Sequence, residues 1–554
     1  MTRSPRTRIL LACLIVAAAA VAVFFKSLDH QFVNWDDDVY VTANPVIQPL
    51  SPQRIGSIFS NFYYYAYIPI TILSHAVDVA LWGLKPRGHH LTNVLLHAAN
   101  AVWVFLLGLA LLRRAPGRGD GAPAGRGKTA RPVGGNDLPL VIGAFVAAVL
   151  FAVHPLRAES VSWISDRKDL LCAFFFLPAV AAYVTYASRR SRPEGRPWYL
   201  ASFVLFLLAV LSKSIAVVFP ALALLLDWLW IRERAVRPAR LVLEKVPFLL
   251  VSLVLAALPL AMSPDGKLAY AIADLTRLEM VLFPFYSLTF SLYKTLLPIH
   301  LQPIYPRVGL GWMVAGLVVV LALTALCVFQ ARRGRKAMLL AWLSYLLLLV
   351  PNVAGLSSGM QPVADRYSYL STIGLYILVG AAVAWAWEKG SGKGRLALAV
   401  CSAALLLVFA RATVSQAAHW KSSTSLWEHV IASAPPKRDY VDAYLNLGTA
   451  YAEERRPIEA REILERALAI DPANAEVLYN LGILSYMEGN APKALEFFRH
   501  ATRADPRHER AFYNLAIVSD ELRRDEEAIA AMIQAARLGN PDAQDALRSR
   551  GIPW

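Results

Sequence analysis

The sequence is poor in charge and in cysteine. Only 17% of its 554 residues are Asp, Glu, Lys or Arg and only four are cysteine, whereas 56% are hydrophobic. A mean hydropathy of +0.43 excludes an ordinary soluble protein of this length. All four cysteines lie in apolar blocks, so no disulfide framework is indicated.

The apolar residues gather in blocks of about 16–22 residues, long enough to cross a hydrocarbon core of ~30 Å. We therefore predict an all-α polytopic membrane bundle with about eleven spans. The predicted spans are residues 9–25, 90–112, 138–153, 169–187, 197–212, 214–231, 246–262, 311–330, 337–353, 370–387 and 396–411. No small-residue cleavage site follows the first span, which favours a retained signal anchor.

Short loops rich in Lys and Arg predict the orientation. The basic loops are residues 113–131, 189–196, 232–240, 332–336 and 388–395, and we assign them and the N-terminus to the cytoplasm. An odd number of spans then places the C-terminal part outside it, in the periplasm if the chain lies in a bacterial inner membrane, or in the endoplasmic reticulum lumen of a eukaryote. Residues 277–300 are interrupted by prolines and Lys294. We interpret them as interfacial or re-entrant. If they formed a twelfth span, the C-terminal part would face the cytoplasm.

The net charge of +16 belongs mostly to these loops. Because the charges occur in small groups at helix ends, they do not indicate nucleic-acid binding.

The sequence becomes charged and repetitive after about residue 412. Residues 441–474, 475–508 and 509–542 align with a period of 34, the length of a tetratricopeptide repeat (TPR) helix pair. We predict a membrane domain at 1–411, a connecting and capping helix at 412–440, three TPRs at 441–542 and a tail at 543–554. TPRs bind peptides and proteins along a concave face, so this part argues for a protein partner.

Three consecutive carboxylates, Asp36, Asp37 and Asp38, follow the first span and are framed by aromatic residues that include Trp35 and Tyr40. A hydrated turn at a membrane surface is one interpretation. A structured site is the other, and it is favoured by the aromatic frame and by the length of the loop, about 64 residues. A carboxylate beside a membrane can take a proton from an acceptor hydroxyl or hold a divalent cation.

A second polar stretch, HPLRAESVSWISDRKDLL at 154–171, is predicted on the same face. Its polar residues include His154, Arg157, Glu159, Asp166, Arg167, Lys168 and Asp169. They fit interfacial snorkelling, but an Arg-Lys pair at the outer end of a span also fits a clamp for a lipid phosphate. Lys213 and the pair Asp365-Arg366 fall on this face as well. The convergence of three polar groups predicts an active site there.

The chain resembles the transmembrane-and-TPR (TMTC-like) family of protein O-mannosyltransferases, above all its bacterial members. The resemblance covers nearly the whole chain, in the strings FVNWDDDVYVTANP, LSHAVDVALWGLKPRGHHLTNVLLHAANAV, HPLRAESVSWISDRKDLL, SKSIAVVFPALALLLD and DRYSYLSTIG, followed by TPRs. That family belongs to the glycosyltransferase C (GT-C) superfamily. The resemblance implies a GT-C-like fold, a polyprenyl-phosphate sugar donor and an acidic motif in the first exported loop.

By this resemblance, Asp37 or Asp36 acts as the general base on an acceptor hydroxyl, with Asp38 and Glu159 as supporting acidic residues. The residues expected to hold the donor phosphate are Arg167, Lys168, Lys213 and Arg366, and further site candidates are His75, His89 and His154.

We therefore expect a membrane glycosyltransferase that moves a sugar such as mannose from a polyprenyl phosphate to a Ser or Thr hydroxyl of an exported protein. A divalent cation, Mg²⁺ or Mn²⁺, is a candidate cofactor without assigned ligands. Two alternatives stay open: a non-catalytic membrane-anchored TPR scaffold, and a ligase of lipid-linked oligosaccharides.

Overall fold

A computed structural model describes residues 4–63, 66–115, 137–231, 236–262, 275–353, 361, 363–433 and 437–554. The regular structure of these residues is helical, apart from one isolated bridge between Tyr63 and Ala66. The chain divides into two compact units, Met1–Ser422 and Ser423–Trp554. The all-α prediction is therefore confirmed.

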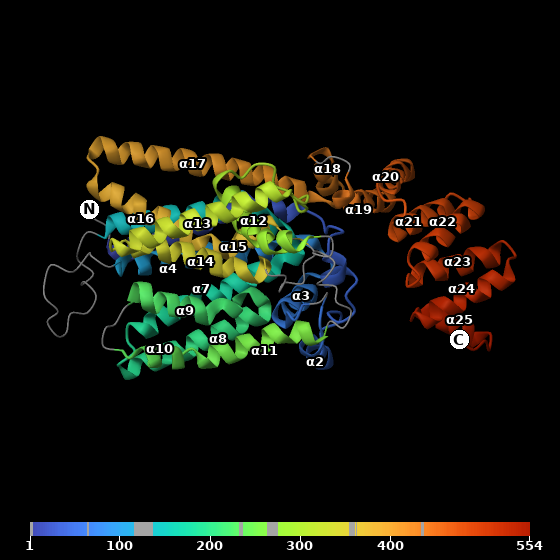
Figure 1. The fold of residues 1–554 in the computed structure, drawn as a ribbon, viewed down its shortest axis with the longest axis horizontal. Helices are drawn as coiled ribbons and strands as arrows, with labels where there is room; N and C mark the ends of the chain where they lie inside the picture. Colours follow the sequence, from blue (N-terminus) through green and yellow to red (C-terminus); the bar gives the residue numbers. More distant parts are fainter. Residues whose placement is uncertain are drawn as a thin grey trace. The chain divides into compact units, whose positions relative to one another are not determined.

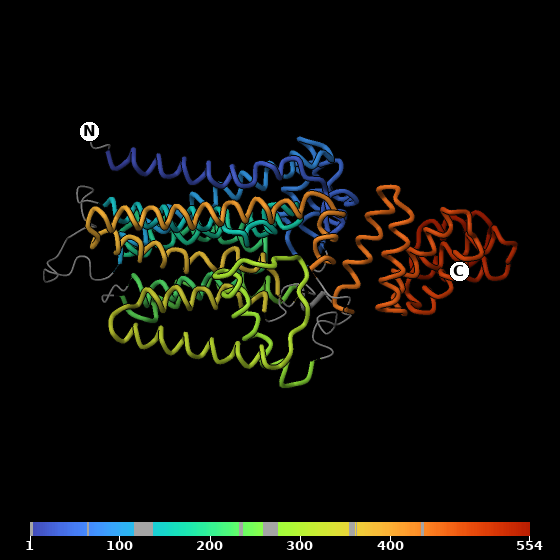
Figure 2. The backbone as a smooth tube through the Cα atoms, turned by 90° about the horizontal axis from the view of Figure 1, so that it is seen from above, coloured from blue at the N-terminus to red at the C-terminus, as the bar shows by residue number. Residues whose placement is uncertain are grey.

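The first unit is a bundle whose long helices run side by side (Figures 1 and 2). The longer helices are α1 (Pro5–Phe24), α3 (Pro69–Trp82), α4 (Pro86–Arg113), α5 (Leu138–Val153), α7 (Arg167–Ala187), α8 (Arg196–Ser212), α11 (Val246–Met262), α12 (Arg277–Leu296), α13 (Leu310–Arg332), α14 (Lys336–Val353), α16 (Ile373–Lys389) and α17 (Gly392–Ala418). The shorter helices are α2 (Pro52–Ser60), α6 (Arg157–Ser162), α9 (Phe219–Leu226), α10 (Pro238–Leu243) and α15 (Ser368–Ser371). Several begin with proline, which suits the first turn because its N–H groups have no partner within the helix.

Eight helices in the described ranges are long and apolar enough to cross a membrane, and α15 with α16 forms a ninth candidate bent by 57°. The predicted spans 138–153 and 246–262 correspond to the shorter apolar helices α5 and α11. The number of eleven crossings stays a prediction. The predicted interfacial or re-entrant segment 277–300 is mostly the continuous helix α12, which is not among the eight. The predicted basic loops lie partly outside the described residues, at 116–136 and 232–235.

Apolar side chains cover the outside of the bundle as well as its core. Only 6% of the apolar window of α17 and 22% of that of α13 is buried within the protein. Large side chains such as Leu321 and Leu407 are exposed there. A stripe of this kind is unfavourable in water and favourable in lipid. The chain is therefore an integral membrane protein.

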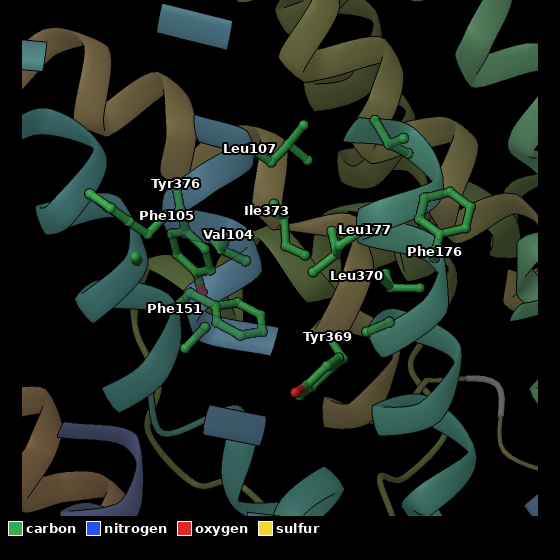
Figure 3. Close-up of a cluster of buried hydrophobic side chains, with 14 of the residues drawn as sticks. Val104, Phe105, Leu107, Phe151, Phe176, Leu177, Tyr369, Leu370, Ile373 and Tyr376 are labelled. Carbon is green, nitrogen blue, oxygen red and sulfur yellow. The ribbon is translucent and has the colours of Figure 1, made fainter. Parts of the chain in front are cut away.

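Small residues let α5 and α16 cross closely. A Cβ atom added at Gly143 would lie 2.2 Å from the carbonyl oxygen of Gly380, and Ala384 is also adjacent. Such small-residue crossings are typical of helices that pack in membranes. Next to this crossing, the aromatic rings of Phe151 and Tyr369 pack edge to face with their centroids 5.2 Å apart (Figure 3).

The polar segments of the first unit meet at one end of the bundle. The Trp163 indole donates a hydrogen bond to the carbonyl oxygen of Trp35 (2.7 Å) and stacks on Trp420 (5.7 Å between centroids). The backbone N–H of Gln31 donates to the carbonyl oxygen of Lys421 (2.9 Å). The loop after α1, the segment before α7 and the end of α17 are thus held together.

The second unit consists of TPR helix pairs, drawn in orange and red in Figure 1. Its helices are α18 (Ser423–Ser433), α19 (Val441–Glu453), α20 (Pro457–Ile470), α21 (Ala475–Met487), α22 (Ala491–Ala504), α23 (Glu509–Glu521), α24 (Asp525–Arg537) and α25 (Pro541–Ser549). A Cβ atom added at Gly448 would lie 2.6 Å from Cγ of Leu464, and one added at Gly482 would lie 2.6 Å from Cε1 of Phe498. The small residue therefore recurs because the two helices of a repeat touch there. Residues 434–436 of the predicted capping segment lie outside the described residues.

Candidate active site

Asp37 joins the loop after α1 to the start of α7. Its side chain is buried, and its Oδ2 accepts a hydrogen bond from the backbone N–H of Val33 (2.9 Å). Its Oδ1 accepts hydrogen bonds from the backbone N–H (3.0 Å) and the hydroxyl (2.5 Å) of Ser165. Burial raises the pKa of Asp37 to about 7, although these hydrogen bonds lower it. Both carboxylate oxygens are thus engaged by groups of the protein.

Asp36 has a different environment. It is half-buried, and its φ of 70° is positive, as in only three other non-glycine residues of the described ranges. Such backbone is unfavourable for a residue with a side chain and occurs preferentially at functional sites. Burial raises the pKa of Asp36, and the charges of Lys168 and Arg366 act in the opposite direction. The neighbouring Asp38 is exposed.

Two ion pairs hold the surrounding segments. Nη1 of Arg366 lies 2.5 Å from Oε1 of Glu159, whose Oε2 accepts a hydrogen bond from the backbone N–H of Arg366 (2.8 Å). Nζ of Lys213 lies 2.7 Å from both carboxylate oxygens of Asp169. Each pair joins segments that are distant in sequence. Glu159 is thereby tied to Arg366, and Lys213 to Asp169, the residue that follows Lys168.

Lys168 is the most exposed of the four predicted cations, with 15% of its side chain accessible. Its Nζ donates to the carbonyl oxygen of Ser165 (3.2 Å) and lies over the rings of Tyr40 and Trp163, at 5.0 and 4.9 Å from their centroids. Its nearest carboxylate oxygen is Oδ1 of Asp166, 4.0 Å away. Lys168 therefore has no close ionic partner of the kind that Arg366 and Lys213 have.

Arg167 points elsewhere. Its Nη2 lies 2.6 Å from Oδ2 of Asp78 on α3 and donates to the carbonyl oxygen of His89 (2.8 Å), while its Nε donates to Oδ1 of Asn93 (2.8 Å). Its Nη1 donates to the carbonyl oxygen of Ser74 (3.3 Å). Every guanidinium nitrogen is engaged, and the side chain is fully buried. Arg167 thus ties α7 to α3 and α4, and its direct partners do not include Asp36 or Arg366, the residues whose charges meet that of Lys168.

The three histidine candidates have other direct partners. His75 is buried and stacks on His89 (6.5 Å between centroids), next to Arg167. His154 packs on Phe409, and its Nε2 lies 3.0 Å from the carbonyl oxygen of Thr295. No three His, Cys, Asp or Glu side chains within the described ranges could hold a metal ion together. The divalent cation therefore stays a prediction without assigned ligands.

Asp166 is the residue that sequence reasoning left without a role. It is fully buried, its Oδ1 lies 4.0 Å from Nζ of Lys168, and its side chain is within hydrogen-bond reach of the Asp169 carboxyl group. The charged string DRKD draws attention to it, but nothing local distinguishes it from Asp169, which pairs with Lys213.

An apolar cavity of about 100 Å³ lies within the bundle. Helices α4, α7, α9, α14 and α16 line it with side chains that include Leu107, Leu177, Leu348 and Ile373. Ile373 and Leu177 point toward each other in Figure 3. Leu370, another lining residue, follows Arg366 by one helical turn. The lining of the cavity therefore comes within four residues of Arg366 along the chain.

Comparisons with known proteins agree with this architecture. A tetratricopeptide-repeat family model matches residues 439–507. Human protein O-mannosyl-transferase TMTC4 is 32% identical over 219 residues, which are 37% of this chain and 27% of TMTC4. Human protein O-mannosyl-transferase TMTC1 is 25% identical over 534 residues, which are 86% of this chain and 57% of TMTC1. The chain thus spans only about a quarter to just over half of these relatives.

Among solved structures, ArnT from Cupriavidus metallidurans bound to undecaprenyl phosphate has a TM-score of 0.36 and 16% identity, and the match covers 88% of this chain and 79% of ArnT. An alignment with TMTC1 that extends over most of the chain, a shorter one with TMTC4 and the TPR match confirm the resemblance noted in the motifs: the chain is similar to the TMTC protein O-mannosyl-transferases.

Proposed function

We propose that this protein is a membrane glycosyltransferase that moves a sugar from a polyprenyl-phosphate carrier to a Ser or Thr hydroxyl of an exported protein. The observation that carries the proposal is the meeting of Asp36, Lys168 and Arg366 at one end of the bundle. A carboxylate and two cations there match the two needs of the reaction, which are to remove an acceptor proton and to stabilise a phosphate leaving group.

Asp36 is the general base of the proposed reaction. The acceptor oxygen forms a bond to the anomeric carbon while the bond from that carbon to the phosphate oxygen breaks, and the acceptor proton passes to Asp36. The sugar is transferred with inversion, and the polyprenyl phosphate leaves as a dianion that needs no proton. Asp37 positions the loop, because its three hydrogen bonds leave it little capacity to accept another proton donor.

Lys168 and Arg366 receive the phosphate of the donor. Lys168 has the weaker ties within the protein, and its ammonium group can move from the Ser165 carbonyl to a phosphate oxygen at small cost. Glu159 holds the Arg366 side chain over the ring of Trp163 (5.5 Å to the centroid), which fixes its direction. Lys213 is proposed to add positive charge to this phosphate site while it stays paired with Asp169.

The apolar cavity supports a lipid-linked donor. Its lining is almost entirely Leu, Ile, Val, Phe and Ala, which suits a prenyl chain and not a nucleotide. The phosphate would then lie at the Arg366 end and the chain would enter the bundle past Leu370.

The TPR unit is proposed to present the acceptor protein. Asn446, Asn480 and Asn514 recur at one position of successive repeats. An amide side chain can both donate to and accept from a peptide backbone, so this ladder suits an extended polypeptide. Under the proposed orientation, with the N-terminus in the cytoplasm of a bacterium, the site and the TPRs face the periplasm, where exported proteins are found.

Transfer from a radiolabelled polyprenyl-phosphate sugar to envelope proteins tests the proposal. Membranes that contain the chain should transfer label, and membranes with Asp36→Asn should not. A wild-type chain that transfers none of several donor sugars, yet retains protein partners in a pull-down through its TPRs, would instead identify a non-catalytic scaffold.

A further inference from the structure

Arg157, the first residue of α6, is a buried cation without a counter-charge. Its side chain is inaccessible, and no Asp or Glu side chain in the described ranges pairs with it. The other buried arginines, Arg167, Arg190 and Arg366, each pair with a carboxylate. Burying a charge without a counter-charge is costly, and in membrane proteins such residues often have a functional role.

The Arg157 guanidinium group contacts neutral groups of α15 and α16 instead. Its Nη2 lies within hydrogen-bond distance of the carbonyl oxygen (3.3 Å) and hydroxyl (3.3 Å) of Ser368, of the Thr372 hydroxyl (3.0 Å) and of the Tyr376 hydroxyl (3.4 Å). Its Cζ also lies over three aromatic rings that are labelled in Figure 3, at 5.1, 5.2 and 5.9 Å from the centroids of Phe151, Tyr369 and Tyr376. Oxygen dipoles and ring faces thus hold the cation.

These contacts lie on both sides of a break in the chain. The segment that contains α15 is bent by 57° relative to α16, and Thr372 is the residue between the two helices. Ser368 begins α15, whereas Tyr376 belongs to α16. A sharp bend between helices needs an identifiable cause. Here one side chain, that of Arg157, joins the two helices across the bend.

Helix α6 holds the same segment at a second point. Glu159, two residues after Arg157, accepts a hydrogen bond from the backbone N–H of Arg366 (2.8 Å) and pairs with its guanidinium group. Arg366 precedes α15 by only two residues, and α15 is a single turn of four residues. A change of angle at the bend would therefore displace Arg366.

We propose that Arg157 is a positioning residue, which fixes the bend between α15 and α16 and thereby the direction in which Arg366 meets the donor phosphate. The inference rests on the proposed function, which assigns that phosphate to Lys168 and Arg366. Because no carboxylate depends on Arg157, replacing it by an apolar residue leaves no buried anion unpaired. The fold should therefore tolerate this change better than the loss of a paired arginine.

The test replaces Arg157 by Met in full-length protein in detergent. KM for a polyprenyl-phosphate sugar should rise by about 10- to 100-fold, the range for a lost hydrogen bond to a charged group. The value of kcat should change less than KM, since Asp36 is unaltered. Backbone hydrogen exchange at residues 365–376 should become faster by about the same factor, while the rest of the bundle and the TPR unit exchange as in the wild type.

Arg190→Met is the matched control. Arg190 is also buried, but it pairs with Asp227 (2.7 Å) beyond the end of α7 that is distant from Arg167. This control should lower the unfolding temperature and leave donor KM and the exchange of residues 365–376 unchanged. In Arg157→Met the unfolding temperature should fall less.

Arg157→Lys separates the contacts from the charge. An ammonium group keeps the charge, but it cannot reproduce the contacts of the longer, planar guanidinium group. Donor KM and local exchange should therefore stay close to those of Arg157→Met. If Lys restores donor KM while residues 365–376 still exchange fast, the charge acts on the phosphate itself and the inference is wrong.

Three other results would overturn the inference: an unchanged donor KM in Arg157→Met, faster exchange throughout the bundle, or a loss of thermal stability as large as in Arg190→Met. If Arg157→Met does not accumulate, Thr372→Val decides, since it removes one contact and keeps the charge. It should raise donor KM and local exchange by about 2- to 10-fold, and no change in either refutes the inference.

Failure of the proposed function is recognised separately. If the wild type transfers no sugar, the proposed function fails, and hydrogen exchange decides whether Arg157 holds the segment of Arg366. Faster exchange confined to residues 365–376 in Arg157→Met upholds that part, and unchanged exchange refutes it.

Discussion

Replacing Asp36 and Asp37 by Asn, one at a time, separates catalysis from loop positioning. The two residues are adjacent in sequence, and Asn preserves the size of each side chain. Asp36 is half-buried near Lys168, whereas Asp37 is buried and bonded to Val33 and Ser165. The same substitution should therefore act on different properties of the protein.

Asp36→Asn removes the proposed base, so kcat should fall by about two to four powers of ten, the usual contribution of general base catalysis. The free energy of unfolding should change little, because the hydrogen bonds that anchor this loop to the fold are made by Asp37 and not by Asp36. Relief of its charge in a partly buried position can even stabilise the loop.

Asp37→Asn should instead act on stability. The Asn carbonyl can still accept both hydrogen bonds from Ser165, but its NH₂ group must then face the N–H of Val33. One buried hydrogen bond is lost and two donors oppose each other, which costs about 1–3 kcal/mol. Transfer activity should fall less than in Asp36→Asn, because this change affects the reaction only by displacing the loop.

Thermal unfolding in detergent and transfer from a labelled donor, measured on the same preparations, check both expectations. Asp29→Asn serves as the matched control, since it makes the same chemical change at an exposed ion pair. The reasoning is refuted if Asp37→Asn abolishes transfer with unchanged thermal stability while Asp36→Asn remains active.

Four further predictions concern the cations, pH and orientation. Lys168→Met should raise KM for the lipid donor by about 10- to 100-fold with normal protein yield, as kinetics and expression will show. Arg167→Met should leave Asp78 buried and unpaired, cost about 3–5 kcal/mol and lower the membrane yield, while donor KM in surviving protein stays unchanged. Because burial raises the folded-state pKa of Asp37 to about 7, thermal stability should fall as pH rises from about 4 to 7, and Asp37→Asn should flatten this dependence. A periplasm-dependent reporter fused after Trp554 should be active, and activity of a cytoplasmic one would contradict the proposed orientation.

The TPR unit could be predicted almost completely because its determinants are local. A repeat of 34 residues packs each helix on its nearest neighbours, so a small residue must recur wherever two helices touch. The packing of Gly448 on Leu464 and of Gly482 on Phe498 is the physical cause of that recurrence. The apolar blocks of the membrane part are likewise local, and every predicted span is helical in the structure.

The partners of the charged residues could not be predicted, because they depend on segments far apart in sequence. Arg167 and Lys168 are neighbours at the start of α7, where successive side chains point about 100° apart. One therefore reaches Asp78 on α3, whereas the other lies over Tyr40 and Trp163. The string RK resembles one phosphate clamp, but the fold separates its two members.

The roles within the string DDD were equally hidden. Asp37 is the buried carboxylate: it accepts hydrogen bonds from the distant Ser165, and the residue before it, Asp36, has a positive φ. Neither the contact nor the backbone angle has a signature in the sequence, since any of the three aspartates could occupy the anchored position.

The ionic groups of this bundle end differ in how firmly the protein holds them. Glu159 with Arg366, and Asp169 with Lys213, satisfy each other and join distant segments. Removing one member leaves a buried charge, so such groups mainly maintain geometry. Lys168 and Asp36 lack a close ionic partner of this kind, and the phosphate and acceptor hydroxyl of the proposed reaction would engage both. Binding energy would then come from groups that the fold leaves unsatisfied, while the paired groups hold them in place.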